Sequence, residues 1–182
     1  MRMMKTVLLA LCVLLLAGSL AFGADTVKIG LLVPLTGPAA ADGTSALYSV
    51  QIALDQVNAA GGVLGKKVEL VYYDDRADAK EAVALSHKLI EQDGIDAFVA
   101  GSYSLPTRAV APIFQEEGIP LVAAYAIHPD VTRAGDYCFR NGFLGMVEGR
   151  AAGYTAHKLL GGKTVALLTS DNDFGRTLVV GF

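Results

Sequence analysis

Three hydroxyl side chains gather at the start of a predicted helix and give this sequence its clearest candidate for ligand chemistry. Ser102, Ser104 and Thr107 follow a short apolar run that is typical of a β-strand. At a helix N-terminus, free backbone N–H groups and the positive end of the helix dipole favour an anion such as a carboxylate. A serine here also serves as a helix cap. The pattern therefore predicts an anion-binding loop, with capping as an alternative that can coexist with it.

Two other polar motifs lack the spacing that their chemistry requires. The run 161–164, GGKT, looks like the end of a phosphate-binding loop, but His157 stands where the first glycine is needed. That run also leads from helix to strand, which is the wrong order for nucleotide binding. Asp74, Asp75 and Asp78 lack the strict spacing and glycine turn of a loop for a hard cation. We therefore expect neither a nucleotide cofactor nor a metal.

The histidines do not form a catalytic arrangement. His87 and His157 fall on predicted helices without a paired ligand, and His128 lies beside Pro129 in a loop. No serine or cysteine nucleophile occurs in a recognisable motif near them. We expect a protein that is not an enzyme.

The elements that must position these groups alternate between strand and helix. Apolar runs predict strands at 27–33, 67–73, 97–100, 120–123, 137–140 and 164–169. An amphipathic run predicts a helix that has Leu47 and Val57 on one face and ends at Asn58. Similar runs predict helices at 79–93, 105–117 and 144–160, and a further helix begins near 175. Such alternation favours an α/β fold with a doubly wound parallel sheet covered on both faces.

In open parallel sheets, ligands bind outside the carboxyl ends of the strands. That rule selects the loops 35–43, 74–78, 101–107, 124–129 and 170–175. Tyr103 and Tyr125 lie in two of these loops and are candidates for the cleft, whereas Tyr72 and Tyr73 are expected to pack within a strand.

Several motifs carry a resemblance to a known family. They are IGLLVPLTGPAAADG, ALDQVNAAGGVLGKKVELVYYDD, the strand and loop 97–107, EEGIPLV and TSDNDFG, and together they cover nearly all of residues 27–175. The sequence resembles the N-terminal half of periplasmic substrate-binding proteins of the branched-chain amino acid (leucine/isoleucine/valine) type, which have the type I periplasmic-binding-protein fold. The resemblance implies two lobes that close on a small ligand and deliver it to the membrane permease of an ABC transporter.

The resemblance also implies roles for individual residues. Ser104 falls where a loop serine binds the ligand carboxylate, and Tyr125 falls where a main-chain carbonyl accepts from the ammonium group. Ala126 and Ile127 complete that loop, and Phe174 falls where an aromatic residue of the second lobe closes over the ligand. The candidate ligand-binding residues are Asp42, Tyr103, Ser104, Thr107, Tyr125, Ala126, Ile127 and Phe174.

Two of these positions depart from the family pattern. Ile127 stands where amino-acid binders usually have Thr or Ser, and Asp42 stands where an apolar or aromatic residue often lines the pocket. We expect a small amphipathic solute, zwitterionic or amide-bearing, with branched-chain or related amino acids first. The alternative is a ligand-sensing receptor module of the same fold, for an amide or a small organic acid.

The order of segments predicts three parts. Residues 1–23 read as a signal peptide, 24–142 as most of the first ligand-binding lobe, and 143–182 as the start of a second, truncated lobe. The asparagine and glycine at 141–142 mark the boundary, since a complete sheet ends there.

The N-terminus and the charge balance indicate the compartment. Arg2 and Lys5 precede an apolar run at 7–17, and small residues at 21 and 23 fit a signal-peptidase site. Removing residues 1–23 leaves 13 basic residues against 18 acidic ones, a formal charge of −5. That charge argues against nucleic acid or an anionic membrane as partner. We expect a soluble periplasmic protein.

We predict that signal cleavage leaves Ala24 as the first residue of the exported protein. Intact-mass measurement of the periplasmic fraction should show the loss of residues 1–23. Retention of Met1 in the membrane fraction would contradict this prediction.

Overall fold

A single parallel sheet organises the molecule. The computed structural model describes residues 26–182, so the predicted signal peptide lies outside the described residues. The strands are β1 (Val27–Val33), β2 (Val68–Asp74), β3 (Ala97–Ala100), β4 (Leu121–Ala123) and β5 (Cys138–Arg140). They form one sheet in the order β2-β1-β3-β4-β5, and every neighbouring pair is parallel. The predicted parallel α/β sheet is confirmed.

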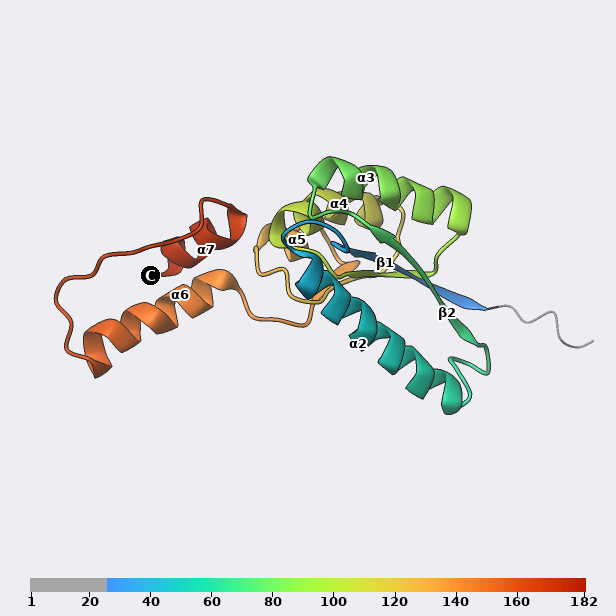
Figure 1. Cartoon of the computed structure of the whole chain (residues 1–182), viewed down its shortest axis with the longest axis horizontal. Helices are drawn as coiled ribbons and strands as arrows, with labels where there is room; N and C mark the ends of the chain where they lie inside the picture. The colour runs from blue at the N-terminus through green and yellow to red at the C-terminus, as the bar shows by residue number, and fades with distance from the viewer. Residues whose placement is uncertain (1–25) are drawn as a thin grey trace, which may run out of the picture.

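Helices lie on both faces of this sheet, with α3 and α4 on one side and α2 on the other (Figure 1). The helices are α2 (Ala40–Ala59), α3 (Ala79–Lys88), α4 (Ser104–Glu116), α5 (Asp130–Arg133), α6 (Gly145–Tyr154) and α7 (Asp173–Gly181). Short π-helical turns, η1 (Leu89–Asp93) and η2 (Thr155–Leu159), extend α3 and α6. The predicted helices 79–93 and 144–160 are therefore each a helix with a π-helical end. Among residues 26–182, no helix is both long enough and apolar enough to cross a membrane.

The larger core lies between the sheet and helices α3 and α4. Strand residues alternate between the two faces, so that Leu32, Phe98 and Leu121 all point into this core. Phe114 of α4 is fully buried and stacks on Phe98, with 4.0 Å between the ring centroids and 7° between the planes. This contact fixes α4 over β3 and thereby places the N-terminus of α4 at the carboxyl end of that strand.

Helix α2 packs on the opposite face through a smaller core that contains Leu31, Val33 and Leu47. Its C-terminal end is tied to the sheet by Asn58. The Asn58 side chain donates to the Val68 carbonyl at 2.9 Å and accepts from the Val68 N–H at 2.8 Å. Because Val68 begins β2, these two bonds fix the register of α2 along β2 and so set the position of its N-terminal turn.

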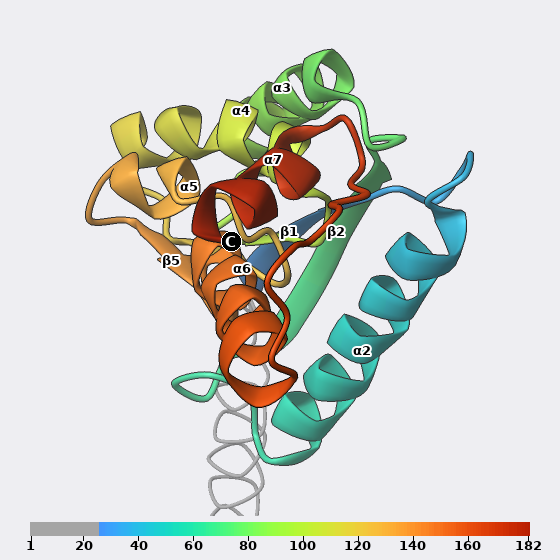
Figure 2. The same cartoon turned by 90° about the vertical axis from the view of Figure 1, so that its left-hand side faces the viewer.

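Helices α6 and α7 pack side by side beyond the carboxyl ends of the strands (Figure 2). Glycines let the two backbones approach closely. A Cβ atom on Gly149 would lie 2.0 Å from the Leu178 carbonyl oxygen, and one on Gly181 would lie 2.1 Å from that of Met146. The Gly145 N–H donates to the Ile127 carbonyl at 3.1 Å and ties the start of α6 to the loop after β4.

The predicted strand at 164–169 is wrong. This segment is assigned no strand, and its Leu168 side chain is fully exposed. A β-strand depends on hydrogen bonds to a neighbour. The only sheet in the described part of the chain is the one built from β1 to β5, and this segment is not part of it. The apolar pattern of residues 164–169 is therefore not enough by itself to make this segment a strand.

Candidate functional site

The strand order creates a crevice between β1 and β3. The chain leaves β1 toward α2 on one face and leaves β3 toward α4 on the other, so the two loops diverge at the carboxyl edge. Such a switch point is the usual ligand position in open α/β sheets. Two predicted site residues meet across it, since the Tyr103 hydroxyl donates to Asp42 Oδ2 at 2.5 Å.

A cavity of about 650 Å³ lies between the carboxyl-edge loops and helices α6 and α7. It is lined by Ala77, Tyr103, Ser104, Leu105, Pro106, Tyr125, Ile127, Phe143, Glu148, Asn172, Asp173 and Phe174. Five of the eight residues selected from the sequence are in this lining, namely Tyr103, Ser104, Tyr125, Ile127 and Phe174. The structure thus brings together residues from three separate loops.

The other three selected residues lie elsewhere. Asp42 lines a second, adjoining cavity of about 440 Å³. Thr107 is buried beneath the loop after β3, where its hydroxyl donates to the Ser102 carbonyl at 3.3 Å. Ala126 is buried as well, and its carbonyl accepts from Arg140. Thr107 and Ala126 therefore support the loops without lining either of these two cavities.

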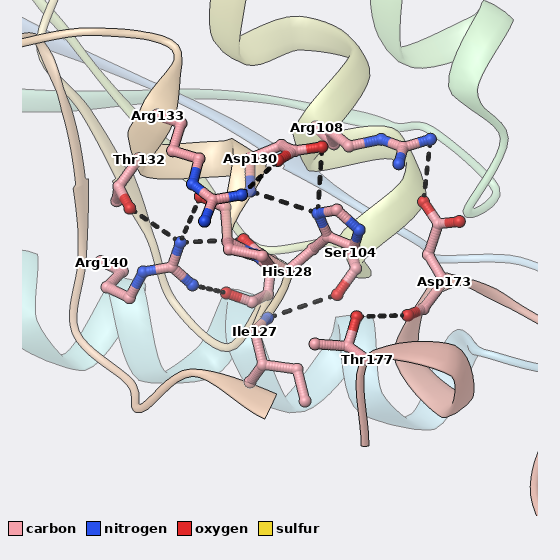
Figure 3. A network of polar contacts seen from close by, with 12 residues as sticks. Ser104, Arg108, Ile127, His128, Asp130, Thr132, Arg133, Arg140, Asp173 and Thr177 are labelled. Atoms are coloured by element: carbon pink, nitrogen blue, oxygen red, sulfur yellow. Dashed lines mark hydrogen bonds and ion pairs between the residues drawn. The ribbon is translucent and has the colours of Figure 1, made fainter. Parts of the chain in front are cut away.

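Ser104 joins two of the site loops. It is the first residue of α4, is only 3% exposed, and its Oγ accepts from the Ile127 N–H at 3.3 Å (Figure 3). The N-cap residue of α4 is Tyr103, and no side-chain capping bond forms there. The interpretation of Ser104 as a helix cap is therefore wrong. Because Oγ is an acceptor toward Ile127, its own hydrogen remains free to donate to a ligand.

Arg140 braces the loop that contains Ile127 (Figure 3). Its guanidinium donates to the carbonyls of Ala126 at 3.2 Å, His128 at 2.8 Å and Pro129 at 3.4 Å, and to Thr132 Oγ1 at 2.9 Å. Partial burial lowers the pKa of Arg140. A planar group with five donors can hold several carbonyls at once, which suits an irregular loop.

The far wall of the cavity comes from the start of α7. Asn172 caps this helix by accepting from the Gly175 N–H at 2.9 Å. Asp173 forms an ion pair with Arg108 of α4, with 3.1 Å between Oδ2 and Nη2, although the angle is not that of a hydrogen bond. The cap and the ion pair set the direction of α7 and so place Phe174 at the cavity.

Several lining residues were not selected from the sequence. Ala77, Leu105, Pro106, Asn172 and Asp173 nevertheless lie within the loops that the carboxyl-edge rule had picked out. Phe143 and Glu148 lie outside those loops, in the connection to α6 and in its first turn. An acidic residue in a first helical turn is common for electrostatic reasons alone, so no sequence pattern indicates that Glu148 faces a cavity.

The loop after β2 adopts an unusual backbone beside the cavity. Arg76 and Ala77 have φ values of 54° and 56°, a left-handed region that side chains other than glycine seldom occupy. Asp74 accepts from the Arg76 N–H at 2.9 Å and Asp75 accepts from the Ala77 N–H at 3.0 Å. These two side-chain bonds stabilise the turn and hold Ala77 in the cavity wall.

The two aspartates of this turn have opposite electrostatic properties. Burial alone would raise the pKa of Asp74, but hydrogen bonds from Thr36, Leu35 and Arg76 outweigh burial and lower it. Asp75 is fully buried, and desolvation raises its pKa. Its Oδ2 has no hydrogen-bond partner of good geometry among the described residues, although the nearby Ser102 hydroxyl partly offsets the shift.

Comparison with known proteins is decisive for the family. A family model described as periplasmic binding protein matches residues 26–182. The chain belongs to this family. The leucine-, isoleucine-, valine-, threonine- and alanine-binding protein of Pseudomonas aeruginosa is 35% identical over 158 residues, which is 86% of this chain and 42% of that protein.

Solved structures agree with this family assignment. The branched-chain amino acid substrate-binding protein LivJ of Streptococcus pneumoniae, in complex with isoleucine, superposes with a TM-score of 0.81 at 30% identity, over 86% of this chain and 45% of that one. A solute-binding protein of Rhodopseudomonas palustris in complex with 3,4-dihydroxybenzoic acid gives 0.80 at 28% identity, over 86% and 42%. The chain spans less than half the length of these relatives.

We predict that Asp75→Asn changes stability in a pH-dependent way. The folded state raises the pKa of Asp75 above the ordinary aspartate pKa. The contribution of Asp75 to the free energy of unfolding is therefore fully present below the ordinary pKa, and it is lost as pH rises through the pKa of the folded state. The variant does not incur this loss. Its melting temperature, relative to wild type, should therefore increase from pH 4 to pH 7.

Asp74→Asn is the matched control with the opposite sign. The folded state lowers the pKa of Asp74, so its contribution is present at pH 7 and disappears as pH falls. Asp74→Asn should be less stable than wild type at pH 7, with a smaller difference at low pH. Parallel pH profiles for the two variants would contradict this electrostatic account.

Proposed function

We propose that this protein is the periplasmic solute-binding component of an ABC transporter for an aliphatic, zwitterionic amino acid. The similar proteins named above bind branched-chain amino acids or an aromatic acid. Residues 24–142 form most of one ligand-binding lobe in this proposal, and 143–182 begin the second. The ligand binds between them, in the cavity that Ser104 and Phe174 line from opposite sides.

The observation that carries the proposal is the opposite polarity of the two cavity walls. On one wall, the buried Ser104 hydroxyl and the N-terminus of α4 favour a carboxylate. On the other, Glu148 and Asp173 supply carboxylates. Arg108 neutralises Asp173, whereas Glu148 forms no ion pair with another described residue. A ligand with both an anionic and a cationic group matches this arrangement.

The remaining lining favours an aliphatic side chain. Leu105, Ile127, Phe143 and Phe174 supply apolar surface, and the two phenylalanines are about half exposed. Covering these rings with a ligand side chain removes apolar area from water, at about 25 cal/mol for each Å². The cavity therefore favours leucine-like solutes over strongly polar ones.

A carboxylic acid without an ammonium group is the second candidate. Ser104 would serve such a ligand equally well, and two phenylalanines suit a flat or branched hydrocarbon. The similar Rhodopseudomonas palustris protein binds 3,4-dihydroxybenzoic acid. A sensing module for small organic acids would use the same contacts. The two candidates differ in whether Glu148 contributes to affinity.

We predict that Glu148→Gln weakens binding of L-leucine about tenfold, because it removes a charge-assisted contact to the ammonium group. Binding of 4-methylpentanoate, which is leucine without its amino group, should stay unchanged. Calorimetry on the full-length protein measures both ligands. Glu117→Gln, at the exposed far end of α4, is the matched control and should change neither.

The outcome separates the candidate ligands. If wild type binds 4-methylpentanoate as tightly as leucine, or if Glu148→Gln affects both equally, the amino-acid proposal is wrong and an organic-acid ligand replaces it.

We predict two separate effects for Ser104→Ala. Loss of the hydroxyl donor should reduce leucine affinity about ten- to hundredfold, as expected for a hydrogen bond to a charged group worth about 1.5–3 kcal/mol. Stability should fall by about 1–3 kcal/mol, because the buried Ile127 N–H loses its acceptor. Calorimetry and thermal melting measure them independently. A lowered melting temperature with an unchanged Kd would leave Ser104 with a structural role only.

A further inference from the structure

A second cavity adjoins the proposed ligand site and shares a wall with it. It measures about 440 Å³, and its lining includes Asp42, Ser45 and Ser49 of α2 together with Tyr103 and Tyr125. Tyr103 and Tyr125 also line the larger cavity. Their two rings therefore separate the cavities, and they contact each other edge to face at 6.2 Å between centroids.

Hydrogen bonds at the ring tips hold this wall in place. Tyr125 donates to the Gly101 carbonyl, within the same carboxyl edge. Tyr103 donates to Asp42, which comes from α2 on the opposite face of the sheet. Since the Tyr103 side chain is partly exposed, packing alone does not fix it, and the bond to Asp42 determines where the ring stands.

The polar part of the second cavity comes from the first turns of α2. The hydroxyls of Ser45 and Ser49 donate to the carbonyls of Ala41 and Ser45, one turn back, which leaves their oxygen lone pairs as acceptors. Asp42 is the only charged residue of the lining. A carboxylate with hydroxyl acceptors nearby matches a cationic, donor-rich group.

We propose that Tyr103, held by Asp42, determines specificity by limiting the bound amino acid to a short aliphatic side chain, and that the cavity behind it is a latent subsite for a cationic side chain. The inference rests on the proposed function, because it assumes an amino acid in the larger cavity. In wild type, the Tyr103 ring blocks the passage and its hydroxyl occupies the carboxylate that a cation would use.

The test compares L-leucine with L-arginine by calorimetry on the full-length protein. Tyr103→Ala opens the wall and frees Asp42, so the affinity for arginine relative to leucine should rise about tenfold or more. Tyr103→Phe keeps the ring but loses the hydrogen bond to Asp42. It should raise the affinity for arginine relative to leucine by less than Tyr103→Ala does. Asp42→Ala, added to either variant, should abolish the gain, since the arginine side chain then has no ionic partner.

Tyr48→Ala is the matched control, because this tyrosine is exposed on α2 and lines neither cavity. Its arginine-to-leucine ratio should equal that of wild type. An unchanged ratio in Tyr103→Ala, or a gain that persists without Asp42, overturns the inference. If Tyr103→Ala fails to fold, Tyr103→Phe decides by the same criterion. Failure of wild type to bind leucine is a separate result, which overturns the proposed function itself.

Discussion

Parallel pairing of all five strands sends every carboxyl end to one edge of the sheet, and this constraint makes the site possible. Each strand must be followed by a crossover, so each loop at that edge is free of the sheet and available for ligand contacts. The order β2-β1-β3-β4-β5 adds a reversal between β1 and β3. Without that reversal the loops carrying Asp42 and Tyr103 would leave on the same face. The bond between them exists because α2 and α4 start on opposite sides.

Backbone groups connect the edge loops to one another, and Ile127 is central among them. Its N–H donates to Ser104 at the start of α4, while its carbonyl accepts from Gly145 at the start of α6. The same loop is fixed from behind by Arg140. A ligand that contacts Ser104 therefore contacts a residue whose position is coupled to both helices. Such coupling suits a site that forms between the sheet edge and helices α6 and α7, because a change in position at Ser104 also affects the start of α6.

The acidic residues at the carboxyl edge of the sheet differ in burial and in how readily they ionise. Asp74 is saturated with donors and keeps its charge, whereas Asp75 is buried with an unsatisfied oxygen and resists ionisation. Both stabilise a turn with two left-handed residues, of which Ala77 forms part of the cavity wall. Strained or incompletely satisfied groups of this kind are typical of functional sites, where geometry is favoured over stability. Asp42 and Glu148 differ from them, because they are exposed and can respond to a ligand.

The sequence by itself determined the sheet, its strands and the loops at its carboxyl edge, because local periodicity and helix-stop residues set each element independently of its neighbours. Ser104 followed from its place at a helix start, and motif order indicated the family.

Tertiary structure decided which segments join the sheet and which side chains meet, and periodicity could not. The run 164–169 has a strand pattern but lies outside the sheet. Glu148 faces the cavity only because α6 packs on α7. Asp42 bonds Tyr103, 61 residues away, only because strand order brings their loops together. Contacts between distant segments depend on topology, which no local pattern encodes.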